Sequence, residues 1–214
     1  MKLNKIANIG IGVLFFIFFA TLGTVLVINF GALYRFDVKH LNIEAISGYS
    51  YDVIMENYNA LIAYCSPFFF GKLEFPTLPA SASGLSHFAE VKIIFNGCYI
   101  LMGLSFILLC IFIIRKRKHH DFHYLKTASI TSILIPILIG LGMSINFDKV
   151  FVIFHKIFFR NDDWLFDPAT DPVITILPED YFMHCAIVIV AVVILGSLAL
   201  YLAYLIHKKK GVSK

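Results

Sequence analysis

Three histidines, His87, His155 and His184, are the side chains of this chain best suited to acid–base chemistry. An unperturbed imidazole has a pKa of about 6.5, so it can accept and return a proton near neutral pH. His155 lies in an aromatic stretch between Phe154 and Lys156. A histidine at a lipid–water boundary can also act as a simple amphipathic anchor, and both interpretations stay open.

Charged and polar residues accompany two of these histidines. Glu90 follows His87 by three residues, so on a helix the two share a face. The carboxylate can orient the imidazole, or it can simply favour the positive end of the helix dipole. Lys92 can bind substrate or place its ammonium group at the membrane edge. The stretch 160–163, Arg-Asn-Asp-Asp, can bind a polar headgroup or end a helix.

Motifs of other catalytic classes are absent from the sequence. It contains no GxSxG, HExxH, P-loop or GxGxxG pattern, and no ligand spacing typical of a zinc site. Ser83 and Ser86 lie near His87, which leaves a serine-based lipid hydrolase or acyltransferase as one alternative. No metal is expected.

Four long uncharged runs have to position these residues. The chain has 214 residues, of which 59% are hydrophobic and only 15% charged. A membrane-spanning helix needs about 20 apolar residues, and lipid forces the backbone to satisfy its own hydrogen bonds. The sequence therefore predicts an all-α integral membrane protein with four transmembrane helices, at 6–34, 93–114, 127–147 and 181–206.

The distribution of Lys and Arg predicts the orientation. Most basic residues lie near the N-terminus, in the connection 115–126 and in the tail 207–214, whereas nearly all acidic residues lie in the other connections. Because cytoplasmic segments carry the basic excess, both termini are expected in the cytoplasm. The net charge of +4 then reflects topology and indicates no nucleic-acid partner. The spans hold no Asp, Glu, Lys or Arg away from their ends, which argues against a charge-driven transporter.

The two remaining connections, 35–92 and 148–180, are rich in aromatic residues. We expect them to form a small extracytoplasmic cap at the lipid–water boundary, where amphipathic aromatic rings prefer to lie. Residues 51–63 are predicted to form a helix, and 148–159 an interfacial helix with apolar spacing typical of one. Residues 79–86 are small and read as a flexible stretch before the second span. A bridge between Cys98 and Cys185 is conceivable, but spacing alone cannot support it.

Two motifs, with their order and spacing, resemble a known family. They are HFAEVK at 87–92, and FHKIFF at 154–159 followed by NDDWLFDP at 161–168 and LPE at 177–179. The chain resembles the bacterial lipoprotein intramolecular transacylase family, Lit, over nearly its whole length. In the first motif, the family often has Asp where this chain has Glu90.

The resemblance implies an enzyme that moves the sn-2 acyl chain of a diacylglyceryl lipoprotein to the α-amino group of its N-terminal cysteine. His87 and His155 match the family's two catalytic histidines; we expect His155 to act as base and His87 to assist the oxyanion or leaving group. The other candidates, for substrate binding or orientation, are Tyr58, Phe88, Glu90, Lys92, Phe154, Phe158, Arg160, Asp163 and Trp164.

Converting an ester to an amide runs downhill, so no cofactor is expected. The expected setting is the bacterial plasma membrane, with a monomeric multi-pass enzyme whose site faces outward and whose partners are the lipoprotein and membrane lipid. Without the resemblance, a non-enzymatic membrane interaction or assembly subunit remains the main alternative to an enzyme.

Overall fold

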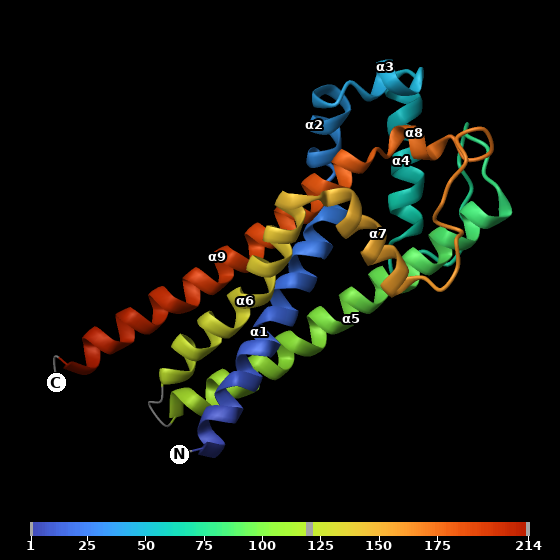
Figure 1. Ribbon diagram of the computed structural model, residues 1–214. Helices are drawn as coiled ribbons and strands as arrows, with labels where there is room; N and C mark the ends of the chain where they lie inside the picture. Colours follow the sequence, from blue (N-terminus) through green and yellow to red (C-terminus); the bar gives the residue numbers. More distant parts are fainter. Residues whose placement is uncertain (1, 119–121, 213–214) are drawn as a thin grey trace. The chain divides into compact units, whose positions relative to one another are not determined.

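The computed structural model describes residues 2–118 and 122–212, and every regular element in this range is an α-helix (Figure 1). Residues 119–121, part of the predicted basic connection, and 213–214 lie outside the described residues. In chain order the helices are α1 (Lys2–Asn29), α2 (Ala32–His40), α3 (Ile43–Ser47), α4 (Tyr51–Tyr64), α5 (Ala82–Lys118), α6 (His123–Ile145), α7 (Phe147–Phe158), α8 (Val173–Ile176) and α9 (Glu179–Val212).

Four of these helices are long and apolar enough to cross a membrane: α1, α5, α6 and α9. This confirms the all-helical class and the four apolar helices that the sequence predicts. The first helix ends at Asn29, although the uncharged run continues to Tyr34. Asn29 and Gly31 are residue types that favour helix ends, and Gly31 is the N-cap of the separate helix α2.

The chain divides into two compact units. The first comprises Met1–Thr24, Cys98–Ser144 and Ile187–Lys214, and the second comprises Val25–Gly97 and Ile145–Ala186. In the first unit, small residues allow helices to approach closely: a Cβ on Gly12 would meet the Thr131 side chain at 2.7 Å. The buried hydroxyls of Ser132 and Ser197 are 2.7 Å apart, a polar contact typical of helices packed in lipid.

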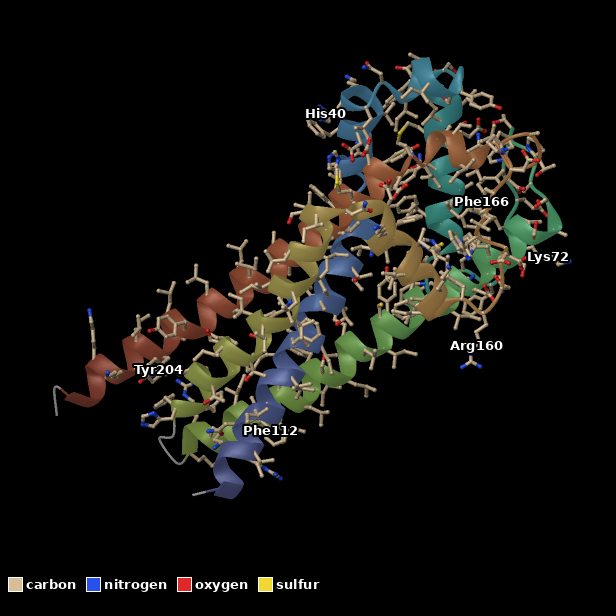
Figure 2. The ribbon with its side chains drawn as sticks, viewed as in Figure 1. His40, Lys72, Phe112, Arg160, Phe166 and Tyr204 are labelled. Atoms are coloured by element: carbon tan, nitrogen blue, oxygen red, sulfur yellow. The ribbon has the colours of Figure 1, made fainter. Side chains whose placement is uncertain are left out.

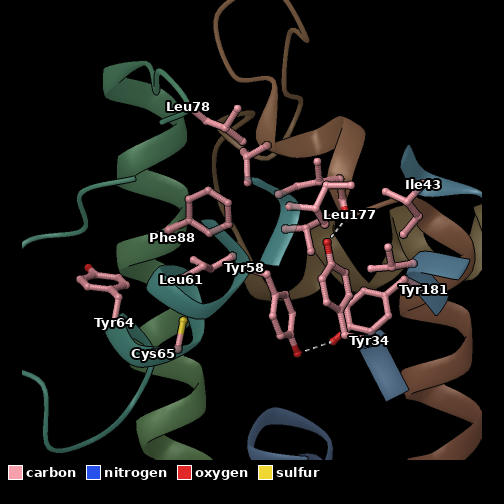
Figure 3. Close-up of a cluster of buried hydrophobic side chains, with 14 of the residues drawn as sticks. Tyr34, Ile43, Tyr58, Leu61, Tyr64, Cys65, Leu78, Phe88, Leu177 and Tyr181 are labelled. Atoms are coloured by element: carbon pink, nitrogen blue, oxygen red, sulfur yellow. Dashed lines mark hydrogen bonds between the residues drawn. The ribbon is translucent and has the colours of Figure 1, made fainter. Parts of the chain in front are cut away.

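The second unit has its own core, drawn in Figure 3. Tyr34, Tyr58 and Tyr181 meet at its centre: the first two rings stack with centroids 3.7 Å apart, and Tyr181 lies edge-on to both. The Tyr34 hydroxyl donates to the carbonyl of Ile176 in α8, at 2.7 Å. Burial raises the pKa of Tyr34 and Tyr58 above the usual value, so both hydroxyls stay protonated. This core joins α2, α4 and α8, and Phe88 of α5, the neighbour of His87, packs in it.

Helix α5 begins earlier than the sequence suggested. Residues 79–86 were expected to be flexible, but α5 starts at Ala82 because Ser81 caps it: the Ser81 hydroxyl accepts from the Gly84 amide at 3.0 Å. Asp171, 90 positions away, accepts from the Ser81 amide at 2.7 Å and from Thr170. Burial alone would raise the pKa of Asp171, but these hydrogen bonds lower it below its ordinary value. His87 therefore lies in the second turn of a helix, not at the end of a loop.

Replacing Gly84 with alanine is expected to destabilise this start of α5. A Cβ there would collide with Asp171 Oδ1 and lie 3.0 Å from the Phe166 ring, and such overpacking typically costs about 1–3 kcal/mol. Gly97 lies on the same helix with open space around its Cα. Thermal unfolding of the purified protein in detergent should therefore show a lowered midpoint for Gly84→Ala and little change for Gly97→Ala. Equal midpoints would contradict the packing described for Gly84.

Candidate active site

His87 and His155 come together although 68 positions separate them in the sequence. His87 lies near the start of α5 and His155 in the last turn of α7, and their ring centroids are 5.9 Å apart. His87 is only 5% exposed and His155 only 8%. Both belong to the second unit, so one compact region holds the pair.

Aromatic rings surround the pair. Phe159 contacts both imidazoles, with centroids 4.6 Å from His87 and 5.5 Å from His155. Trp164 stacks on His155 at 4.7 Å, and Phe166 meets His87 edge-on at 5.5 Å. Figure 2 labels Phe166 among the side chains of this region. We call His87, His155, Phe159, Trp164 and Phe166 the histidine cluster. Its aromatic rings bury two groups that can accept or donate protons.

The hydrogen bonding of His155 decides which nitrogen can accept a proton. Nδ1 lies 2.8 Å from the carbonyl oxygen of Phe151. A carbonyl oxygen only accepts, so Nδ1 must carry the hydrogen and the neutral ring keeps a free lone pair on Nε2. Burial lowers the pKa of His155 below 6.5, and the bond to Phe151 opposes this only in part. At neutral pH, Nε2 of His155 is therefore an acceptor, as a general base requires.

His87 has a different environment. Its Nδ1 is buried and, among the residues that the structure describes, has no hydrogen-bond partner. A buried polar atom without a partner is costly, and such atoms are often found where a ligand group supplies the missing contact. The next residue, Phe88, points into the core (Figure 3). It stacks on Phe166 with ring centroids 5.3 Å apart. His87 is thus held by apolar packing and has a ring nitrogen available for a reactant.

Glu90 hydrogen-bonds to Asn161 and, among the described residues, not to the imidazole of His87. Its Oε1 accepts from Asn161 Nδ2 at 2.9 Å, and its Oε2 is buried without a partner in the described part of the chain. Asn161 also accepts from the Asp163 amide through Oδ1 and from Trp164 Nε1 through its carbonyl. Through Trp164, which stacks on His155, this network connects the Glu90 face of α5 to the second histidine.

The remaining candidates lie at different distances from the pair. Phe154 contacts His155 edge-on at 5.5 Å and packs on Phe158 at 4.7 Å, but both phenylalanines are about half exposed. Arg160 is exposed, as Figure 2 also shows. Lys92 donates to the carbonyl of Phe69 at 2.8 Å and lies over the Tyr64 ring.

Two candidates belong to other parts of the second unit. Tyr58 lies in the tyrosine core, and no described ring contact links it to either histidine. His184 hydrogen-bonds to the fully buried Asp37 at 2.8 Å and lies near His40. All four cysteines carry free thiols, so Cys98 and Cys185 form no bridge.

The sequence analysis does not single out Phe159 and Phe166, and it considers Asn161 only within 160–163, as a headgroup-binding or helix-ending residue. All three lie inside the motifs at 154–159 and 161–168. Nothing in the sequence distinguished them from their aromatic or polar neighbours. The serine alternative receives no support from the geometry, because the Ser83 hydroxyl bonds to Ser81 at 2.9 Å and Ser86 is exposed.

An all-helical chain with four apolar helices and two buried imidazoles in one aromatic cluster has the features of a membrane enzyme that moves protons. A sequence profile described as lipoprotein intramolecular transacylase Lit matches residues 9–182. The chain belongs to the Lit family, and it is therefore a multi-pass membrane protein and an acyltransferase of the lipoprotein intramolecular transacylase class. Among curated protein sequences no significant match is found.

Solved structures agree with this assignment. The membrane-integral transacylase Lit from Bacillus cereus superimposes with a TM-score of 0.95 at 35% identity, with 100% of each chain covered. A variant of that protein with one histidine replaced by arginine gives 0.85 at 37% identity, covering 100% of this chain and 94% of the other. A variant with alanine at the same histidine gives 0.89 at 35% identity, covering 100% and 97%.

Proposed function

We propose that this enzyme moves the acyl chain on the sn-2 oxygen of a diacylglyceryl-modified lipoprotein to the α-amino group of that lipoprotein's N-terminal cysteine. The product is a lyso-form lipoprotein with an N-acyl group. The observation that carries the proposal is the 5.9 Å separation of the His87 and His155 rings within one buried cluster. At this separation, both imidazoles can reach the substituents of a single tetrahedral carbon held between them.

Between heavy atoms, the reaction forms one bond and breaks one. The neutral α-amine attacks the ester carbonyl, the carbon–nitrogen bond forms, and the bond from carbon to the sn-2 oxygen breaks. The nitrogen loses a proton and the departing glyceryl oxygen gains one, so the step is balanced without a cofactor. Because an α-amino group has a pKa of about 7.7–8.0, a base is needed to keep the nitrogen nucleophilic and to take its proton.

The hydrogen bonds support a division of these tasks. His155 takes the proton from nitrogen, because its Nδ1–H is held by Phe151 and its Nε2 lone pair is free. His87 stabilises the oxyanion or protonates the leaving oxygen, because its Nδ1 is buried and free of protein partners among the described residues.

The aromatic walls have two roles in this scheme. The amine and the ester belong to one flexible molecule, and holding them together can contribute several kcal/mol, up to about 7–11 in ideal intramolecular cases. Phe159, which contacts both imidazoles, and Trp164, which stacks on His155, are the side chains best placed to hold the glyceryl group. The same rings limit water, which would otherwise hydrolyse the ester.

The proposed orientation in the membrane follows from the distribution of Lys and Arg along the chain. The basic residues near both termini and in the connection 115–126 favour a cytoplasmic position for these segments. The connections 35–92 and 148–180, which carry both histidines, then form the extracytoplasmic cap, and 148–159 the interfacial helix. We propose that the enzyme acts as a monomer at the outer face of the bacterial plasma membrane.

Mass spectrometry of lipoprotein N-terminal peptides tests the reaction. Co-expression with a diacylglyceryl lipoprotein should yield cysteine that carries an N-acyl and an S-monoacylglyceryl group. Free fatty acid together with an unmodified amine would indicate a hydrolase, and an unchanged lipoprotein would favour an interaction subunit. Either outcome would contradict the proposed transfer.

A further inference from the structure

Glu90, a carboxylate beside the histidine cluster, is not used by the transfer step described above. Glu90 is three residues from His87 on α5, so the two side chains are neighbours on one helix face. Its Oε1 is fixed by Asn161 Nδ2 at 2.9 Å, whereas its Oε2 is buried and has no partner in residues 2–118 and 122–212. The unused oxygen is therefore held at a fixed position rather than free to turn toward water.

We infer that Glu90 Oε2 is the subsite for the substrate's α-amino group, and that Asn161 positions it. This inference rests on the proposed function, since it supplies the binding contact for that nucleophile. The hydrogen-bonding preference of the carboxylate indicates which ligand group it binds. An ionised carboxylate only accepts hydrogen bonds and prefers a cation. Of the groups next to the reacting ester, the α-amino group alone is cationic when protonated and offers two N–H donors when neutral.

The same contact assists the reaction. As the carbon–nitrogen bond forms, the nitrogen gains positive charge until His155 removes its proton. A carboxylate that accepts a second N–H stabilises this charge and aims the nitrogen lone pair at the ester carbon. Glu90 keeps its own protonation state throughout, so the proton balance of the transfer is unchanged.

Asn161 acts as the positioning residue. Its side-chain amide holds Glu90 Oε1, and its side-chain oxygen accepts from the Asp163 amide at 3.1 Å. Its carbonyl accepts from Trp164 Nε1 at 3.1 Å, so the residue that orients the carboxylate also fixes the ring stacked on His155. Removing the amide would release Glu90 without touching either histidine.

Binding of unreactive substrate analogues tests the subsite separately from catalysis. The pair is a dialkylglyceryl lipopeptide with an ether in place of the sn-2 ester, and the same lipopeptide with hydrogen in place of the α-amine. The wild-type protein in detergent should bind the amine form about tenfold more tightly, the typical effect of a charged hydrogen bond. Glu90→Gln should reduce this preference to about twofold or less, and Asn161→Ala should also reduce it.

Matched variants make the result specific. Glu74 is an exposed glutamate in the same unit and Asp162 an exposed neighbour of Asn161. Glu74→Gln and Asp162→Asn should keep the wild-type preference, and His155→Ala should keep it too, because the base does not bind the amine in this scheme. Unchanged affinity of Glu90→Gln for the analogue without the amine shows that its site is folded.

The outcomes separate the two proposals. If Glu90→Gln retains the full preference, or the wild-type protein shows none, the subsite is wrong whatever reaction the enzyme performs. If the preference behaves as expected but the wild-type enzyme yields no N-acyl product, the proposed transfer fails while the amine subsite stands.

Discussion

Replacing His155 with alanine is expected to lower turnover at pH 7 by about 10²–10⁴-fold, the usual contribution of a general base. The loss should shrink as the pH rises from 7 to 9. Deprotonation of the substrate amine, with a pKa of about 7.7–8.0, helps both enzymes equally, so it does not change their ratio. Hydroxide, about 100-fold more concentrated at pH 9 than at pH 7, helps the variant selectively, because it can take the proton that His155 takes in the wild-type enzyme. Initial rates of N-acyl product formation over this range, relative to the wild-type enzyme at each pH, measure both effects.

An exposed histidine provides the control for this experiment. His40 lies on α2 of the same unit, and His40→Ala should retain the wild-type rate and pH profile. The wild-type rate itself should fall in acid, because the pKa of His155 is lowered by burial and protonation below that value removes the acceptor at Nε2. If the His155→Ala variant shows the same loss of turnover at pH 7 and pH 9, His155 does not act as the general base.

Replacing His87 with alanine is expected to reduce turnover by about 10²–10³-fold, the typical cost of losing one oxyanion donor. This defect should be the same at pH 7 and pH 9, because raising the pH cannot supply a missing hydrogen-bond donor. His87→Gln should recover part of the rate, since its amide can donate to the oxyanion without acting as a base. The same steady-state assay measures all three results.

The corresponding exchange at the other histidine gives the comparison. His155→Gln should recover nothing, because a glutamine amide cannot take a proton from the attacking nitrogen. If glutamine restores activity at position 155 and not at 87, the two roles are reversed. Wild-type turnover by His87→Ala would exclude His87 from the chemistry.

The sequence was sufficient for much of the fold because local signals determine it. Four long uncharged runs predict four apolar helices, and apolar spacing predicts the helices found as α4 and α7. In α7, His155 is buried, whereas Ile153 and Ile157, one turn apart on another face, are exposed.

Other features depend on contacts that no local pattern encodes. The start of α5 is set by Asp171, 90 positions away from Ser81, so residues 79–86 read as flexible when considered alone. The role of Glu90 is set by Asn161, 71 positions away, rather than by its spacing from His87. The aromatic character of Tyr58 makes it a candidate from the sequence, but its partners Tyr34 and Tyr181 place it in the core.

The most direct test of the central claim is the turnover of the double variant His87→Ala/His155→Ala. Two imidazoles in one cluster that act on the same tetrahedral carbon are expected to be coupled, so the double defect should be smaller than the product of the two single defects. A double defect equal to the product of the two single defects would mean that the histidines act independently, which would contradict a shared site.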